Sequence, residues 1–286
     1  MTVWRAPAKL NLSLELRSPD RTGYHPLRSL CQTIEFCDEL AVDFGEEERL
    51  VVEGSEDVPV GEDNLVWKAV RCLVGRPDRP RLDLRLTKRI PAAAGLGGGS
   101  SDAAAALAGV AAAYGTSDDE VVACASSVGS DVPFMLVGGS RIMEGYGEIL
   151  TEVEPLSGFA VAVAVPVFEI PTPAAYRRWD ELGGPVGPAI PERALPPALR
   201  SHGALRNDLT PAAWSIEPEL ADWAGDLAAD WGRPVAMTGS GSAHFAYFHD
   251  LDEATHAAGQ VSGTRAVFAA ELRGTGVGAE DDTESA

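Results

Sequence analysis

A run of glycines in front of an alanine-rich segment is the most distinctive chemical feature of the chain. Residues 91–109 read PAAAGLGGGSSDAAAALAG, and four of the five residues from Gly95 to Gly99 are glycine. Backbone N–H groups can approach a ligand closely where no Cβ intervenes, and a helix N-terminus adds the positive end of a dipole. The pattern predicts a phosphate-binding loop, with a plain turn capped by Ser100 or Ser101 as the structural alternative.

The spacing excludes two familiar phosphate-binding motifs. A P-loop ends in Gly-Lys-Ser/Thr, whereas Gly99 is followed directly by Ser100 and Ser101. A dinucleotide-binding fingerprint requires glycine or alanine at the position of Ser100, together with a regular βαβ context that the sequence does not show. A phosphate loop of another kind is therefore expected at the start of the alanine-rich helix.

Three polar residues are of the types needed for proton and phosphoryl transfer: Lys9, Asn11 and Asp131. Lys9 and Asn11 are two positions apart in the alternating segment AKLNLSLEL, so their side chains leave a strand on the same face, about 6.5 to 7 Å apart. A solvated strand face is the structural alternative for this pair. Asp131 precedes Val132 and Pro133, which is also typical of a helix cap or a turn.

Three further segments carry candidate binding residues. The segment TGYHPL contains Tyr24 and His25, which together offer an aromatic face for stacking and polar groups for hydrogen bonds. The late segment MTGSGSAHF contains Gly239 and Ser240 and predicts either a turn that faces a cleft or a tight hairpin. Lys88 ends the alternating segment LDLRLTKRI, where a surface position is the alternative to a ligand contact.

Six segments, taken in order, resemble the GHMP kinases, a family of small-molecule kinases whose glycine loop wraps the phosphates of ATP. The segments are AKLNLSL, TGYHPL, PAAAGLGGGSSDAAAAL, GSDVPFMLVGG, IPTP and TGSGSAHFAYF, and the resemblance spans about residues 5–250. Ala93 and Ala94 depart from the pattern, because the family often has glycine at these positions.

The resemblance implies phosphoryl transfer from ATP, with Asp131 as the catalytic base and Lys9 orienting and polarising the carboxylate and the substrate hydroxyl. Mg²⁺ is expected to bridge the β- and γ-phosphates, and Ser101 is a candidate contact for the metal or a phosphate. Asn64 is expected near the adenine, although Asp63 beside it also reads as a helix start. The implied nucleotide-binding residues are Gly95, Leu96, Gly97, Gly98, Gly99, Ser100, Ser101, Asn64 and Lys88.

The same resemblance implies an acceptor that carries cytosine, a cytidyl-diphosphate derivative of methylerythritol. Tyr24 and Tyr176 are expected to stack on the base, and His25 to hydrogen-bond its edge. Two of the implied residues have a structural alternative. For Thr172 it is a helix cap, and for Tyr176 it is a place on an amphipathic helix beside Trp179. The implied substrate-binding residues are Asn11, Tyr24, His25, Asp131, Thr172, Tyr176, Gly239 and Ser240.

Two other functions fit the resemblance. One is another GHMP kinase that acts on homoserine, mevalonate or a sugar; the aromatic segment TGYHPL argues against it, because those acceptors contain no base to stack. The other is a non-catalytic nucleotide-binding relative. The presence of both Lys9 and Asp131 argues against that function, because a binding module has no need of a base.

The charge and hydropathy of the chain exclude several classes of partner. Lys and Arg number 23 against 43 Asp and Glu, for a net charge of −20, which repels nucleic acid and anionic lipid. The only lysines are Lys9, Lys68 and Lys88, so an anionic ligand needs a locally positive site. No apolar run reaches the ~18 residues of a membrane span. A cytoplasmic monomer or homodimer is expected.

The cysteines give no indication of a metal site. Cys31, Cys37, Cys72 and Cys124 form no CxxC pair and have no zinc-binding spacing with the five histidines. Free thiols in a reducing cytosol are expected, with a disulfide as the alternative.

Strands and helices mix without regular βαβ alternation, which predicts an α+β class. We expect an N-terminal nucleotide-binding and catalytic domain over residues 1–156, a C-terminal substrate and closure domain over 157–273, and a disordered acidic tail over 274–286. The family resemblance implies a ribosomal-S5-domain-2-like fold for the first domain and a ferredoxin-like fold for the second. Expected elements are short strands within 30–60, helices over 63–75, 117–128 and 218–231, an alanine-rich helix directly after the glycine run, a helix starting at Thr172, and a buried strand GFAVAVAVPVF.

Overall fold

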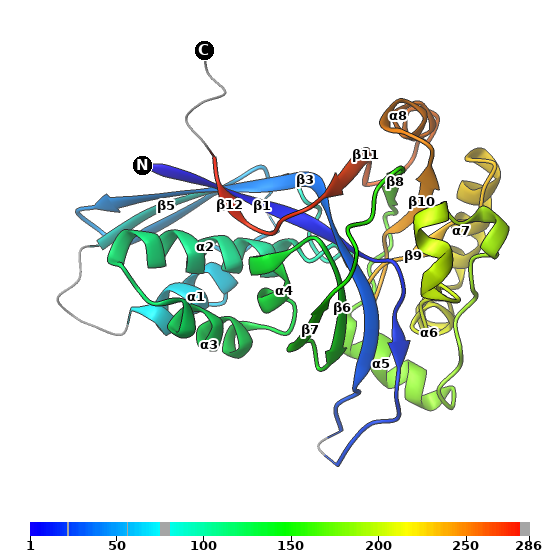
Figure 1. Ribbon diagram of the computed structural model, residues 1–286, viewed down its shortest axis with the longest axis horizontal. Helices are drawn as coiled ribbons and strands as arrows, with labels where there is room; N and C mark the ends of the chain where they lie inside the picture. Colours follow the sequence, from blue (N-terminus) through cyan, green and yellow to red (C-terminus); the bar gives the residue numbers. More distant parts are fainter. Residues whose placement is uncertain (22, 56, 75–80, 281–286) are drawn as a thin grey trace.

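Two long antiparallel strands, β1 (Thr2–Asn11) and β3 (Leu27–Gly45), form the frame of the molecule (Figure 1). The computed structural model describes residues 1–21, 23–55, 57–74 and 81–280. The sequence predicted several short strands between residues 30 and 60; β4 (Arg49–Glu53) is one, but the prediction was wrong for the residues before it. β3 is one 19-residue strand because β1, β5, β6 and β11 all pair along it.

The first half of the chain packs four helices against one face of the sheet. The alanine-rich helix α2 lies against β1 and β3, and Ala103 to Ala106 are fully buried beside Leu82, Leu84 and Leu86. A Cβ on Gly109 would lie 2.7 Å from a methyl carbon of Val42, so small residues let α2 approach the sheet closely. The elements of this half are β2 (Glu15–Leu16), β4 (Arg49–Glu53), α1 (Leu65–Leu73), β5 (Arg81–Thr87), α2 (Gly98–Tyr114), α3 (Asp118–Val128), α4 (Val132–Val137), β6 (Ser140–Gly145) and β7 (Ile149–Glu152).

The second half is built around β8 (Ala160–Val165), the apolar strand that the sequence predicted to be central. All six residues of β8 are buried, and the strand lies between β10 and β11. The predicted helix over 218–231 is confirmed as α7, which ends before Gly232. The remaining elements are α5 (Thr172–Glu181), η1 (Glu192–Ala194), η2 (Pro197–His202), α6 (Thr210–Ile216), α7 (Pro218–Asp230), β9 (Ala236–Met237), β10 (His244–Phe248), α8 (Leu251–Ala258), β11 (Ala266–Arg273) and β12 (Gly278–Ala279).

The two halves share one continuous sheet. β11 pairs with β8 along most of its length and then with β3 at Leu272 and Arg273. The path through the sheet runs β12-β1-β3-β11-β8-β10-β9, and β4 and β5 form its parallel pair. This mixed architecture is the α+β class that the sequence predicted. The boundary expected at residues 156 and 157 stays a prediction.

The segment after residue 273 departs from the expected disorder. Gly278 and Arg5 are paired in the β12–β1 ladder, as are Ala279 and Trp4. The main-chain N–H of Val277 also donates to the Met135 carbonyl at 2.9 Å. Backbone hydrogen bonding therefore orders residues 274–280, a contribution that side-chain composition does not reveal. The rest of the predicted tail, residues 281–286, lies outside the described residues.

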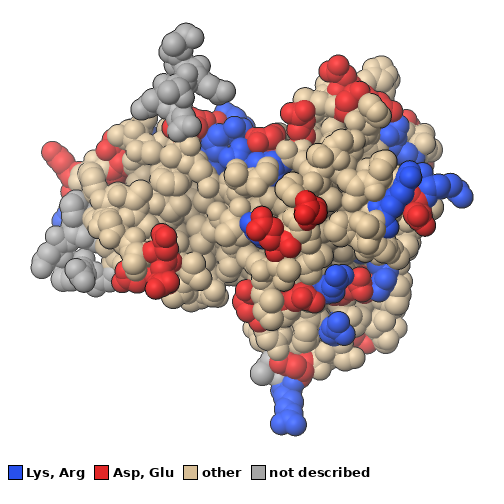
Figure 2. All heavy atoms as spheres, in the orientation of Figure 1, with Lys and Arg blue, Asp and Glu red and all other residues tan. Residues whose placement is uncertain are grey.

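Acidic and basic side chains are interspersed over the face shown in Figure 2, with no extended basic surface on it. This distribution agrees with a chain whose net charge is −20. Within the described part of the chain, no helix combines the length and apolar character needed to cross a membrane.

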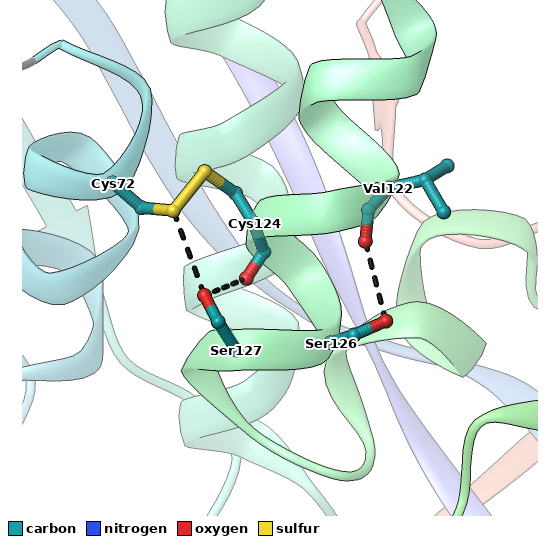
Figure 3. Close-up of a disulfide and its surroundings, with 5 residues drawn as sticks. All are labelled: Cys72, Val122, Cys124, Ser126 and Ser127. Atoms are coloured by element: carbon teal, nitrogen blue, oxygen red, sulfur yellow. Dashed lines mark hydrogen bonds between the residues drawn. A yellow bond between two sulfur atoms is a disulfide. The ribbon is translucent and has the colours of Figure 1, made fainter.

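A disulfide between Cys72 and Cys124 contradicts the expectation of four free thiols (Figure 3). Cys72 lies near the end of α1 and Cys124 on the facing side of α3, so the packing of the two helices brings the sulfur atoms together. The Ser127 hydroxyl donates to the Cys124 carbonyl at 2.8 Å. Cys31 and Cys37 are free and buried. Because the bridge spans 52 residues, local spacing could not predict it.

The disulfide is expected to contribute measurably to stability. Replacing the pair by Cys72→Ser and Cys124→Ala should lower the free energy of unfolding by roughly 2–4 kcal/mol, because the unfolded chain is then no longer constrained by the cross-link. Urea titration without reductant measures the difference. Dithiothreitol should lower the wild-type midpoint and leave the double variant unchanged; an identical response of both proteins would contradict the bridge.

Candidate active site

The glycine loop forms an uncapped helix N-terminus. α2 begins at Gly98, and its N-cap residue Gly97 has φ 72° and makes no side-chain capping bond. The alternative in which Ser100 or Ser101 caps the helix is therefore wrong. A Cβ on Gly97 would lie 2.3 Å from Met135 Cε and 3.0 Å from Lys9 Cγ, so only glycine fits this left-handed, close-packed position. The first N–H groups of the helix remain available to an anion.

Ala93 adopts a left-handed backbone conformation at the entrance to the glycine loop. Its φ is 52°, in the left-handed region where a non-glycine residue costs roughly 1–2 kcal/mol. The carbonyl of the next residue, Ala94, accepts a hydrogen bond from the Ala243 N–H at 3.2 Å. The loop entrance is thus held by the second half of the chain in a conformation that glycine would adopt without strain.

Lys9 and Asp131 meet beside this loop. The main-chain N–H of Lys9 donates to the Leu96 carbonyl at 2.9 Å, which fastens β1 to the loop. The Lys9 Nζ lies 3.3 Å from Asp131 Oδ2, and it also donates to Asn11 Oδ1. Asp131 occupies the N-cap position of α4 but makes no capping bond, so its carboxylate is free to face Lys9. Two residues 122 positions apart therefore form one ion pair.

The polar side of β1 is buried, contrary to the half-buried strand that alternation predicted. Lys9 is 4% and Asn11 3% exposed, because the late turn and β3 cover them. The Asn11 N–H donates to Thr238 Oγ1 at 2.9 Å, and its side-chain amide donates to Ser29 Oγ at 2.7 Å. Beneath them, burial raises the pKa of Cys31 to about 11 and keeps that thiol neutral. The solvated-face alternative for Lys9 and Asn11 is therefore wrong.

Lys88 lies behind the loop between two carboxylates rather than at the surface. Its Nζ donates to Asp38 and, at 2.7 Å, to Asp102 of α2. Asp38 also accepts the main-chain N–H groups of Arg89 and Ile90, at 2.5 and 2.8 Å. Burial alone would lower the pKa of Lys88, but the two carboxylates raise it above its ordinary value. The lysine thus holds β5, β3 and the start of α2 together as a cation.

A cavity of about 520 Å³ joins these features. Of the residues predicted to bind nucleotide, all except Ser101 line it; the Ser101 side chain is fully buried and its hydroxyl has no hydrogen-bond partner in the structure. Two of the three lysines of the chain, Lys9 and Lys88, lie in the wall. The predicted site residues in the wall are Lys9, Asn11, Asn64, Lys88, Gly95, Leu96, Gly97, Gly98, Gly99, Ser100, Asp131, Thr172, Tyr176, Gly239 and Ser240.

Asn64 and Thr172 each begin a helix at the cavity, but not as expected. Asn64, rather than Asp63, is the N-cap of α1, and its Oδ1 accepts from the Val66 N–H at 2.9 Å. Thr172 is the first residue of α5 and does not cap it. Its hydroxyl instead lies 2.7 Å from Ser240 Oγ, which joins α5 to the late turn.

The late turn packs directly on the glycine loop. A Cβ on Gly95 would lie 2.3 Å from the Thr238 carbonyl oxygen, and one on Gly239 would lie 2.8 Å from the Gly95 carbonyl oxygen. Asn207 donates to the carbonyls of Met237 and Gly239 at 2.9 and 2.8 Å and so fixes the turn. The same turn closes the hairpin of β9 and β10, which pair at Met237 and His244, and Gly239 and Ser240 line the cavity. Both interpretations of the segment therefore describe it, while its contact with a substrate stays a prediction.

Of the three aromatic candidates, only Tyr176 reaches the cavity. Tyr176 lines the wall, and burial, with the nearby Asp131 carboxylate, raises its pKa to about 12, so the phenol stays neutral. The His25 ring lies 5.5 Å from the Tyr176 ring, one layer behind the wall. Tyr24 is 69% exposed, with its ring 6.3 Å from that of Tyr146. Neither Tyr24 nor His25 is in the wall itself.

Sequence reasoning missed several residues that shape the site. Asp38 and Asp102 hold Lys88, and Thr238 holds Asn11; of these, Asp102 lay inside the quoted glycine motif and was given no role. Asp208, to which the sequence assigned no role, accepts from the N–H groups of Leu16 and Gly187 at 3.0 Å each. It ties two loops together away from the cavity wall.

Comparison with known proteins places the chain beside one group of kinases. A family model described as the GHMP kinases N terminal domain matches residues 64–139. A Geobacter sulfurreducens protein named 4-diphosphocytidyl-2-C-methyl-D-erythritol kinase is 35% identical over 275 residues, covering 94% of this chain and 97% of its own. A crystal structure of 4-(cytidine 5'-diphospho)-2C-methyl-D-erythritol kinase matches with a TM-score of 0.75 at 35% identity, over 94% of this chain and 98% of that one.

A more distant likeness concerns the fold alone. Homoserine kinase from Cytophaga hutchinsonii matches with a TM-score of 0.70 at 16% identity, over 98% of this chain and 97% of that one. Together with the relatives at 35% identity, it confirms the two-domain GHMP kinase fold class expected from the sequence.

The buried trio of Lys88, Asp38 and Asp102 predicts a pH dependence of stability. Burial raises the pKa of Asp102 to about 8, so the folded protein retains a proton that the unfolded chain releases above about pH 4. The free energy of unfolding therefore falls as the pH rises from about 4 to about 8, by at most about 1.4 kcal/mol per pH unit. Between pH 6 and 8, the wild type should lose roughly 1–3 kcal/mol relative to Asp102→Asn, measured by urea titration without nucleotide or Mg²⁺.

The matched control is Asp119→Asn, which removes an exposed carboxylate from the first turn of α3. The free energy of unfolding of this variant should change with pH in parallel with that of the wild type. Parallel profiles for wild type and Asp102→Asn would show that Asp102 is ionised throughout, contrary to this account.

Proposed function

The chain belongs to the GHMP kinase family, in the group of the 4-diphosphocytidyl-2-C-methyl-D-erythritol kinases, and we propose that it phosphorylates the 2-hydroxyl of 4-diphosphocytidyl-2-C-methyl-D-erythritol. It is an ATP-dependent small-molecule kinase. The reaction belongs to the methylerythritol phosphate route to isoprenoids. The observation that carries the proposal is the Lys9–Asp131 ion pair in the wall of the cavity that the glycine loop also lines.

The terminal phosphates of ATP bind at the start of α2. Uncapped N–H groups and the helix dipole supply positive charge there, and Lys9 adds an ammonium to it. This local charge opposes the net charge of −20 that would otherwise repel a nucleotide. Asn64 and its neighbours near the start of α1 also line the cavity, and we place the adenine beside them.

Asp131 acts as the base. Its carboxylate accepts the proton of the acceptor 2-hydroxyl as that oxygen bonds to the γ-phosphorus, and the bond to the bridging oxygen breaks to release ADP. Lys9 orients the carboxylate at 3.3 Å and offsets negative charge where the carboxylate, the hydroxyl and the γ-phosphate meet. Asn11 holds the ammonium from the other side.

Mg²⁺ fits this site as a phosphate-bound ion. Among the described residues, no group of three or more His, Cys, Asp or Glu side chains could hold a metal. Mg²⁺ in kinases is commonly held through phosphate oxygens and water, with few protein ligands. The buried Ser101 hydroxyl, which lacks a partner in the structure, is the candidate oxygen from this chain. When bound, the ion neutralises charge on the β- and γ-phosphates.

The acceptor assignment rests on the aromatic side chains around Tyr176. Tyr176 lines the cavity wall, the His25 ring packs against it, and Tyr24 precedes His25 in the chain. A cytosine can stack on such rings and hydrogen-bond with adjacent polar groups, whereas homoserine and mevalonate have no aromatic ring to stack. Purified protein with Mg-ATP and a panel of acceptors tests this. ADP formation only with the cytidyl acceptor is expected, and turnover of homoserine or mevalonate would contradict it.

The remaining expectations stay predictions. A monomer or homodimer is neither supported nor opposed by the contacts described above. The expected cytoplasmic location rested partly on free thiols, and the Cys72–Cys124 disulfide removes that support.

Asp131→Asn is expected to lower kcat by roughly 10²- to 10⁴-fold, because the amide cannot accept the hydroxyl proton. The KM for ATP should change little, since the phosphates bind at α2. Steady-state ADP release measures both constants. Asp119→Asn, which removes an exposed carboxylate on α3, is the control and should leave both constants unchanged. Turnover of Asp131→Asn within a few-fold of wild type would show that Asp131 is not the base.

Tyr24→Ala is expected to weaken acceptor binding by about 1–3 kcal/mol, because one stacking face for the base is lost. Tyr24 is 69% exposed, so the fold should tolerate the change. Tyr24→Phe, which keeps the ring, should retain most of the affinity. Calorimetric titration with acceptor and with ATP separates the two ligands; equal losses for both would show that Tyr24 has no selective contact with the base.

A further inference from the structure

His25 is held by two oxygen acceptors, one on each ring nitrogen. Its Nδ1 lies 3.1 Å from the Arg17 carbonyl oxygen, and its Nε2 lies 3.1 Å from Asp180 Oδ2 on α5. The His25 side chain is 4% exposed, whereas that of Asp180 is 44% exposed. No sequence motif singled out Asp180, which lies 155 residues after His25.

The two contacts hold the ring from different segments. Each ring nitrogen has one oxygen partner, the Arg17 carbonyl at Nδ1 and the Asp180 carboxylate at Nε2. The ring cannot turn about its Cβ–Cγ bond without losing these contacts. Arg17 and Asp180 together therefore fix the orientation of the buried ring.

The orientation of His25 reaches the cavity through its neighbours on α5. The ring packs at 5.5 Å from Tyr176 and edge-on at 5.2 Å from Trp179. Tyr176 lines the cavity wall, whereas Trp179 is buried, 6% exposed, beneath the helix. Through this ring, one carboxylate links α5 to the segment that carries Tyr24.

Two backbone hydrogen bonds close the segment between Arg17 and Pro26. The Arg17 N–H donates to the Pro26 carbonyl, and the Asp20 N–H to the Tyr24 carbonyl, at 2.9 Å each. His25 lies between these two closures, and it attaches the closed segment to α5 through its ring contacts and through Asp180, which supplies the polar contact. On its other side, Tyr24 contacts Tyr146 of the β6–β7 turn.

We propose that Asp180 is a positioning residue for acceptor selection, which holds His25 so that Tyr24 and Tyr176 keep the separation and tilt needed to receive a pyrimidine base. The proposal rests on the proposed function, because it concerns the base of the same acceptor. Asp180 is not among the residues that line the cavity wall with Lys9 and Asp131. Its loss therefore affects binding of the base and leaves the chemical step intact.

The experiment compares four proteins: wild type, Asp180→Ala, Asp180→Asn and Glu181→Ala. Glu181 is the matched control, a neighbouring carboxylate on the same helix that pairs with Arg178 at 2.9 Å. Calorimetry gives the Kd of cytidine 5'-diphosphate and of ADP, kinetics gives kcat and both KM values, and thermal unfolding verifies the fold. Asn serves as a rescue, because its amide can donate to an unprotonated Nε2 and keep the ring in place.

Asp180→Ala is expected to raise the acceptor KM and the Kd of cytidine 5'-diphosphate roughly tenfold, the worth of one partly buried hydrogen bond. Its kcat, ATP KM and ADP Kd should stay within about twofold of wild type, as should every constant of Glu181→Ala. Asp180→Asn should recover part of the lost affinity.

Unchanged cytidine affinity in Asp180→Ala would overturn the inference while leaving the proposed function in place. Parallel losses for cytidine and adenine ligands, together with a lower melting temperature, would also overturn it, because they indicate a general structural role. Failure of the wild type itself to bind cytidine 5'-diphosphate or to phosphorylate the acceptor would overturn the proposed function, and this inference with it.

Discussion

A buried ammonium group places the strongest constraint on this structure. Lys9 is 4% exposed, and a charge that is removed from water to this degree is stable only with an anion and hydrogen-bond acceptors around it. Asp131 supplies the anion from the start of α4, and Asn11 supplies an acceptor from the same strand. β1, the glycine loop and α4 must therefore keep their relative positions for the charge to be compensated. The geometry that suits phosphoryl transfer is thus maintained by the folded state itself.

The second half of the chain completes the site by contact with the first. The turn after β9 packs on the glycine loop so closely that Gly95 and Gly239 leave no space for a Cβ on either side. The hydroxyls of Thr172 and Ser240 then join α5 to that turn. β11 adds backbone pairing to β3, so the sheet itself ties the halves together. The wall of one cavity is consequently formed by residues from both halves of the sequence.

The sequence predicted those features whose causes are local. The glycine turn before the alanine-rich helix and the buried strand β8 were each predicted from a short run of neighbouring residues. The structure contains both. The meeting of Lys9 with Asp131 could be expected only through family resemblance, because 122 residues separate them. The length of β3, the Cys72–Cys124 disulfide and the Lys88–Asp38 contact depend on packing between distant segments, and no periodicity encodes them.

Crystallography of the protein with a non-hydrolysable ATP analogue, Mg²⁺ and the cytidyl acceptor tests the central claim most directly. The distances of interest join the acceptor 2-hydroxyl oxygen to the Asp131 carboxylate and to the γ-phosphorus. The account predicts that the hydroxyl lies within hydrogen-bond distance of Asp131, about 2.6–3.2 Å, and faces the γ-phosphorus beside the Lys9 ammonium. A γ-phosphate bound away from Lys9, or an acceptor hydroxyl remote from Asp131, would contradict it.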